Sequence, residues 1–275
     1  MKYPMCALVA LAALPPGLCP AHADSDLTYG RDIQGSRLVA PRRNAACLSG
    51  EATEEASALK KRLQEMDALR TGANTPFQEI EKQARDLLGQ YTLPDDRAKI
   101  YFELAHIYAQ SGIRLHPERV IRYGRLALAS ERDPVRRGVL YSYLGSAAEI
   151  DPTQLTFAGQ RAQAAVVWLQ GYRELLPLHL PVVAPELPVV EKLDVDALDP
   201  SQLASARLKH EAQMKARQEA ERLQQLVAHR DIFVRQLKET YAREPRADAE
   251  LRSLVRRELG DKQAADTLLS QILPK

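Results

Sequence analysis

Five prolines divide the middle of this chain into segments of similar length. They stand at positions 76, 94, 117, 134 and 152, so successive intervals are 18, 23, 17 and 18 residues. Proline is tolerated in the first turn of a helix, where its missing N–H has no partner to lose, and it disrupts a helix further in. An apolar-periodic run follows each of these prolines. The spacing therefore predicts an all-α fold, in which helices of about four turns fold back and forth as a solenoid of helical hairpins.

The N-terminal 23 residues have the pattern of a secretory signal peptide. Lys2 precedes an uncharged apolar run, 5–14, and a Pro-Pro-Gly break leads to Ala21-His22-Ala23. This small-x-small ending is what a signal peptidase requires, and the apolar run is too short for a permanent membrane anchor. We expect cleavage near Ala23 and an exported protein, either periplasmic or secreted.

Charge and cysteine content limit the partners of the mature chain. Removal of residues 1–23 would leave 37 Lys and Arg against 36 Asp and Glu. This balance gives no general electrostatic reason to expect nucleic acid or an anionic membrane as a partner. No later apolar run is long enough for a membrane span. Cys47 would be the one remaining cysteine, so it is either buried and inert or bonded to another chain.

Composition divides the rest of the chain into four parts. Residues 24–50 lack sustained periodicity and are predicted to form a flexible arm. Residues 51–176 form the predicted helical-hairpin domain, with a first helix over 51–70 and a second that Thr75 caps. Residues 177–199 are a proline-rich linker, which we predict to be extended and packed through its valines.

Residues 200–275 form a predicted C-terminal helical region. Nothing breaks the helix that begins at Pro200 until Glu244-Pro245, which gives one helix of over 40 residues. Its first half, 203–222, is mostly charged, and its second half carries an apolar stripe. Two short helices, 247–259 and 261–273, follow, and Gly260 separates them as a C-cap.

Two stretches of the hairpin domain resemble the tetratricopeptide repeat. That family alternates large aromatic residues with small ones, so that paired helices approach closely. The matching residues of the first unit are Tyr101, Leu104-Ala105, Tyr108, Val120, Tyr123-Gly124, Ala127-Leu128 and Pro134. A second unit starts with Tyr141 and Leu144-Gly145, although Ala148 stands where an aromatic is expected. The resemblance covers roughly residues 76–176 and implies a surface that binds proteins.

The resemblance also implies which residues contact a partner. The predicted concave face is lined by first-helix residues, namely Lys99, Tyr101, Tyr108, Tyr141 and Tyr143. On the second helix, Arg119, Arg122 and Arg125 recur at every third position. They are either a receptor for an acidic tail or a carboxylate terminus, or a solvated face that is paired with Glu118 and Glu131.

Motifs for catalysis or metal binding are incomplete. The sequence contains no Gly-rich phosphate loop, nucleophile elbow or Cys-x-x-Cys pair. His210-Glu211 begins like a zinc-protease helix, but Met214 occupies the second ligand position. Glu103 and His106 have the spacing of di-iron ligands, but no second Glu-x-x-His exists. We therefore predict no catalytic, metal-binding or cofactor-binding residues.

These observations predict an exported, non-catalytic interaction protein, a scaffold or adaptor for another protein or peptide of the envelope or exterior. One alternative is a structural envelope protein that forms homo-oligomers through helix 200–243, with Cys47 bridging chains. Another is an unrecognised hydrolase of an envelope or extracellular polymer, which would need a buried acid of raised pKa in an open cleft.

Overall fold

The computed structural model describes residues 48–71, 77–111, 116–151, 156–193, 200–242 and 248–273, and every regular element in these ranges is helical. The chain divides into two units, and the second, residues 57–275, contains all of these elements except the first residues of α2. The elements are α2 (Leu48–Thr71), α3 (Phe77–Gln90), α4 (Pro94–Gln110), α5 (Pro117–Leu128), α6 (Pro134–Ala148), α7 (Phe157–Leu175), a 3₁₀ turn (Leu176–Leu178), α8 (Pro200–Ala242), α9 (Asp248–Leu259) and α10 (Lys262–Ile272). The all-α prediction is confirmed. The predicted signal peptide, Cys47 and Thr75 lie outside the described residues.

Three of the five prolines begin helices as predicted. Pro94, Pro117 and Pro134 are the first residues of α4, α5 and α6. The other two lie outside the described residues. The helix expected after Pro152 begins only at Phe157, because Thr156 caps it by accepting a hydrogen bond from the backbone N–H of Gly159.

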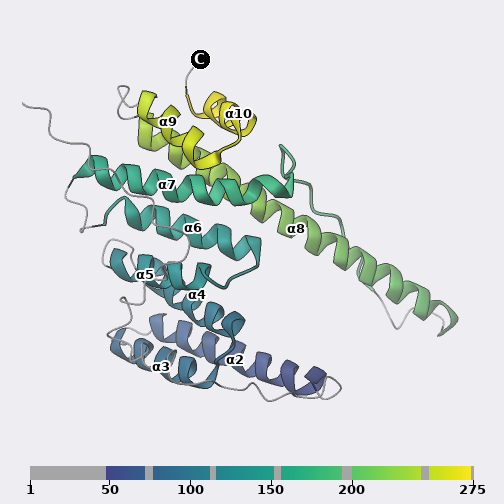
Figure 1. Ribbon diagram of the computed structural model, residues 1–275. Coiled ribbons are helices and arrows are strands. Elements are labelled where there is room, and N and C mark those ends of the chain that lie inside the picture. The colour runs from purple at the N-terminus through teal and green to yellow at the C-terminus, as the bar shows by residue number, and fades with distance from the viewer. Residues whose placement is uncertain are drawn as a thin grey trace, which may run out of the picture. The chain divides into compact units, whose positions relative to one another are not determined.

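The helices α3 to α7 are stacked in chain order, as Figure 1 shows. Glycines stand where two of them cross. A methyl group on Gly145 of α6 would overlap the indole of Trp168 on α7, and one on Gly124 of α5 would lie 2.9 Å from Leu144. The small residues of the repeat-like motif therefore allow the close helix packing that the sequence predicts.

The C-terminal helices pack onto the hairpins. The second half of α8 contacts α6 and α7, α9 contacts α7, and α10 contacts α8 and α9. One core joins them, because the same buried cluster contains Tyr141, Trp168, Phe233, Leu251 and Leu268. The last helices of the predicted hairpin domain, α6 and α7, therefore share one hydrophobic core with the C-terminal region. No helix among the described residues is both long and apolar enough to cross a membrane.

The proline-rich segment is extended, as predicted, and runs alongside α8. His179 reverses the chain with a φ of 47°, and residues 180–193 then contain no helix or strand. The expected burial of its valines is wrong for three of the four: the side chains of Val182, Val183 and Val189 are 87%, 77% and 84% exposed. The reason is that backbone carbonyls attach this segment to α8. Gln224 donates to the Pro185 carbonyl at 2.8 Å, and Arg230 binds two further carbonyls.

Candidate functional site

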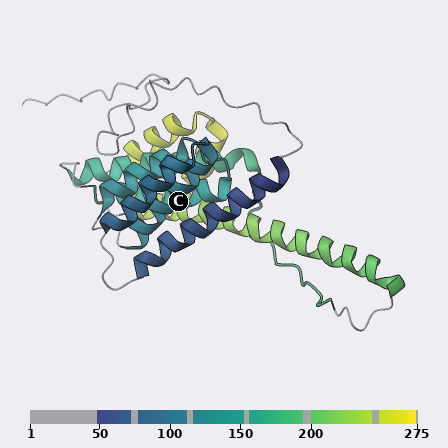
Figure 2. The same ribbon diagram turned by 90° about the horizontal axis from the view of Figure 1, so that it is seen from below.

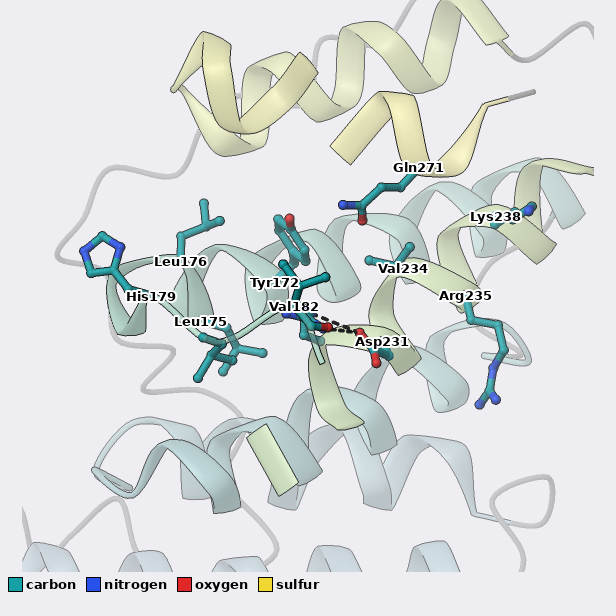
Figure 3. Close-up of a pocket in the computed structure, with 12 residues that line it drawn as sticks. Tyr172, Leu175, Leu176, His179, Val182, Asp231, Val234, Arg235, Lys238 and Gln271 are labelled. Carbon is teal, nitrogen blue, oxygen red and sulfur yellow. Dashed lines mark hydrogen bonds and ion pairs between the residues drawn. The ribbon is translucent and has the colours of Figure 1, made fainter. Parts of the chain in front are cut away.

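An open cleft of about 650 Å³ lies where the proline-rich segment leaves α7 and meets α8. Figure 3 shows side chains from α7, the turn after it, α8 and α10 around this space. The lining residues are Tyr172, Leu175, Leu176, His179, Leu180, Val182, Arg230, Asp231, Val234, Arg235, Lys238 and Gln271. The volume falls within the range of ligand-binding pockets in proteins.

Half of the lining is apolar, and local helix geometry explains its position. Tyr172 and Leu175 lie three residues apart on α7 and so share one face, and Leu176 begins the 3₁₀ turn that follows them. Val234 of α8 adds to this apolar part. The pKa of Tyr172 is raised, because the effect of burial exceeds the opposing effect of the charge of Arg230. The result is a surface suited to apolar side chains of a ligand.

Cationic side chains of α8 border the apolar part. Arg230, Val234 and Lys238 recur every four residues and so lie along one face of the helix. Lys238 makes no ion pair with any residue that the structure describes. Arg235 lies 3.9 Å from Glu239, and both side chains are more than half exposed, so this pair contributes little. The positive charges of Lys238 and Arg235 are therefore available to bind an anionic group of a ligand.

Arg230 differs from these two residues, because its guanidinium binds the proline-rich segment that forms one side of the cleft. It donates to the carbonyl oxygens of Pro181 at 2.6 Å and Val182 at 2.9 Å. It also pairs with Asp231 at 2.8 Å. Hydrogen bonds from a charged donor are stronger than neutral ones. The position of Val182 in the lining therefore depends on Arg230.

Three of the four tyrosines that the repeat resemblance assigned to a binding surface are inside the protein. Tyr101, Tyr108 and Tyr141 are buried. The Tyr108 hydroxyl donates to Glu81 of α3 at 2.8 Å, and Arg119 of α5 binds the same carboxylate. In this position the side chain of Tyr108 joins three helices instead of facing a partner.

The remaining predicted binding residues are dispersed. Lys99 pairs with Asp96 of its own helix at 2.9 Å, and the Tyr143 hydroxyl lies 2.8 Å from His106 Nδ1. The three arginines differ from one another, because Arg119 and Arg122 are half-buried and Arg125 is exposed. Arg119 also lies 4.0 Å from Glu118, whereas Glu131 pairs with Arg136. The structure thus gathers none of these residues into the cleft.

Glu81 and Glu174 anchor two similar side-chain networks. Burial, together with the charge of Glu81, raises the pKa of Tyr123 to about 12. In the second network Arg137 and Tyr141 both donate to Glu174 at 2.5 Å. Burial alone would raise the pKa of Glu174, but these hydrogen bonds outweigh it and lower the pKa. Both networks connect neighbouring helices.

Sequence reasoning missed the cleft because five separate parts of the chain form it, namely α7, the 3₁₀ turn, the proline-rich segment, α8 and α10. The spacing of Arg230, Val234 and Lys238 is the one signal in the sequence that marks this face of α8. Nothing in the sequence connects that face to Tyr172 or to Gln271.

The fold and the cleft define the class: an all-α, helical-hairpin protein with a partly apolar, partly cationic cleft. Comparison with protein-family models, with curated proteins and with solved structures found no match for this chain.

Proposed function

We propose that this chain is an exported, non-catalytic binding protein that acts as a scaffold or adaptor for another protein or peptide of the envelope or exterior. The observation that carries the proposal is the open cleft beside α8, which combines an apolar lining with unpaired positive charge. Clefts of this composition are typical of binding sites. The signal-like N-terminus supports export.

The helical hairpins supply the framework in this proposal, as tetratricopeptide repeats do. Gly124 and Gly145, the small residues of the repeat-like motif, lie at close helix contacts. They support a degenerate relationship to that family over roughly residues 76–176. Such arrays hold a binding surface by stacking, since each unit packs against its neighbours.

The lining indicates the chemistry of the partner. Leu175, Leu176 and Val234 suit apolar side chains, and Arg235 and Lys238 suit a carboxylate. The amide of Gln271 can donate to and accept from a peptide backbone. An extended peptide that carries apolar residues next to an acidic side chain or a C-terminal carboxylate would contact the apolar lining, the two cationic side chains and the Gln271 amide together.

Photo-crosslinking combined with charge reversal tests this proposal. A photoreactive amino acid replaces His179, which is exposed at the cleft, and the protein is irradiated in an envelope extract of the producing cell. We expect one partner to be crosslinked, and the double variant Arg235→Glu/Lys238→Glu to lose it. The matched control, Arg252→Glu/Arg256→Glu, reverses two exposed charges on α9 and should retain it. A partner that is captured equally by both variants would contradict binding in the cleft.

Self-assembly remains a second candidate, and a specific observation favours it. Leu208, in the charged half of α8, has 68% of its surface exposed. Exposed apolar side chains mark contact sites when they form a patch, and the exposed Val189 lies on the proline-rich segment close to Glu191, which contacts Lys209 and Gln213 in the same half of α8. A second copy of the chain would bury them.

A further inference from the structure

Three side chains with metal-binding atoms meet on the hairpins, outside the cleft. They are Asp67 of α2 and Glu103 and His106 of α4, and one ligand atom from each lies within 4.8 Å of the others. The three residues are half-buried. Glu103 and His106 share a face of α4 because they are three residues apart, and Asp67 approaches that face from another helix.

The Glu-x-x-His pair of Glu103 and His106 is incomplete as a di-iron motif, but it provides two of the ligands that a single metal ion needs. A di-iron site needs a second Glu-x-x-His pair and further carboxylates. A mononuclear zinc site needs at least three protein ligands, and where the protein supplies only three, water occupies the fourth position. Asp67 supplies the third ligand, and only the fold reveals it, since it is distant from Glu103 in the sequence.

The orientation of His106 supports a ligand role. Its Nδ1 lies 2.8 Å from the hydroxyl of Tyr143 on α6. Histidines that bind metals usually hold one ring nitrogen in such a hydrogen bond, which fixes the ring and directs the other nitrogen to the ion. With Nδ1 held by Tyr143, Nε2 is the nitrogen that would bind a metal.

We propose that Asp67, Glu103 and His106 bind one Zn²⁺ ion. Imidazole and carboxylate are both zinc ligands, at about 2.0–2.2 Å, and two carboxylates balance the charge of the ion. Ligand atoms at that distance are roughly 3.4 Å apart in a tetrahedron. The ligand atoms therefore need to approach one another by up to about 1.4 Å, which half-buried side chains achieve by small rotations. The ion would fasten α2 to α4.

The test is calorimetric titration of ZnCl₂ into the full chain, purified without a histidine tag and stripped of metal with a chelator. We expect one Zn²⁺ per chain and a higher melting temperature with zinc. His106→Gln and Asp67→Asn should each abolish saturable binding. Tyr143→Phe should weaken it by about 10- to 100-fold, because the histidine is no longer oriented.

Control variants separate this site from incidental zinc binding. His210→Gln removes an imidazole on α8 and should bind zinc as the wild type does. Circular dichroism without metal checks that each variant is folded. If the Asp67 or the His106 variant is not folded, Glu103→Gln is tested in its place. The proposal is overturned if the wild type binds no zinc, if it binds another divalent ion in place of zinc, or if folded Asp67 and His106 variants bind it equally well.

Discussion

At the scale of single residues, the glycines at helix crossings decide how closely the hairpins pack. Gly145 faces Trp168, which is fully buried. The sequence predicts this role, because a small residue follows Leu144 in the repeat-like motif. It does not identify Trp168 as the contacting residue, since periodicity shows which face of a helix is apolar but not what packs against it.

Substitution of this glycine should destabilise the protein. In Gly145→Ala the added methyl group overlaps the indole of Trp168, and overpacking of this kind costs about 1–3 kcal/mol. The control is Gly89→Ala in α3, where nothing lies within 4 Å of the new methyl group. That change should be neutral or stabilising by up to about 1 kcal/mol. Urea denaturation measures both, and equal stability of Gly145→Ala and the wild type would contradict the packing.

The buried tyrosines predict how stability depends on alkaline pH. Burial and the charge of Glu81 raise the pKa of Tyr123 to about 12, whereas an unfolded tyrosine titrates near pH 10. The proton is therefore held more tightly in the folded state. This stabilisation is fully present below about pH 10 and is lost as pH rises through about 12. The free energy of unfolding should fall over that window.

Removal of the charge of Glu81 tests this account. In Glu81→Gln we expect the pKa of Tyr123 to move toward 10, because the carboxylate is one of the causes of its elevation. Tyrosine ring-carbon NMR resolves the titration of each phenol. Glu79→Gln, on the same helix, should leave it unchanged. Titration of Tyr123 near pH 10 in the wild type would contradict both its burial and its contact with Glu81.

At the scale of elements, prolines and glycines carry most of the predictive information. Pro94, Pro117 and Pro134 mark the starts of helices because their rings fit only the first turn. Gly260 separates α9 from α10 in a left-handed conformation, with a φ of 69°, as the sequence predicts. The position of the proline-rich segment could not be predicted, because hydrogen bonds from α8 to backbone carbonyls hold it, and carbonyls leave no signature in a sequence.

Arg230 should hold the first part of this segment, around Pro181 and Val182, against α8. Arg230→Ala removes the donors to the carbonyls of Pro181 and Val182, so the segment should detach from α8 locally without unfolding the core. We expect faster cleavage by an elastase-type protease near Val183 and faster amide exchange there. Arg235→Ala is the control, since Arg235 pairs with Glu239 on its own helix. Unchanged cleavage in Arg230→Ala would mean that other contacts hold the segment.

At the scale of the whole described unit, the core and the cleft were beyond sequence reasoning for the same reason. Both bring together residues that are distant along the chain. The buried cluster joins Trp168 to Phe233 and Leu268, and the cleft joins Tyr172 to Gln271. Apolar periodicity predicted each helix separately, but the partner of each apolar face depends on how the helices fold together.

The exposed first half of α8 indicates that the protein associates with itself at high concentration. Figures 1 and 2 show that this half extends beyond the other described helices, with the proline-rich segment beside it. Leu208 and Val189 are exposed there, and association would remove their apolar surface from water. We therefore expect weak self-association that grows with concentration.

Sedimentation velocity over a range of concentrations measures this self-association, with and without reductant so that any bridge through Cys47 is recognised. Val189→Glu and Leu208→Glu should each reduce it, because a carboxylate resists burial. Leu93→Glu introduces the same charge at another exposed leucine and should have no effect. If the wild type is a strict monomer at the highest concentration, the apolar surface along α8 does not bind a second copy.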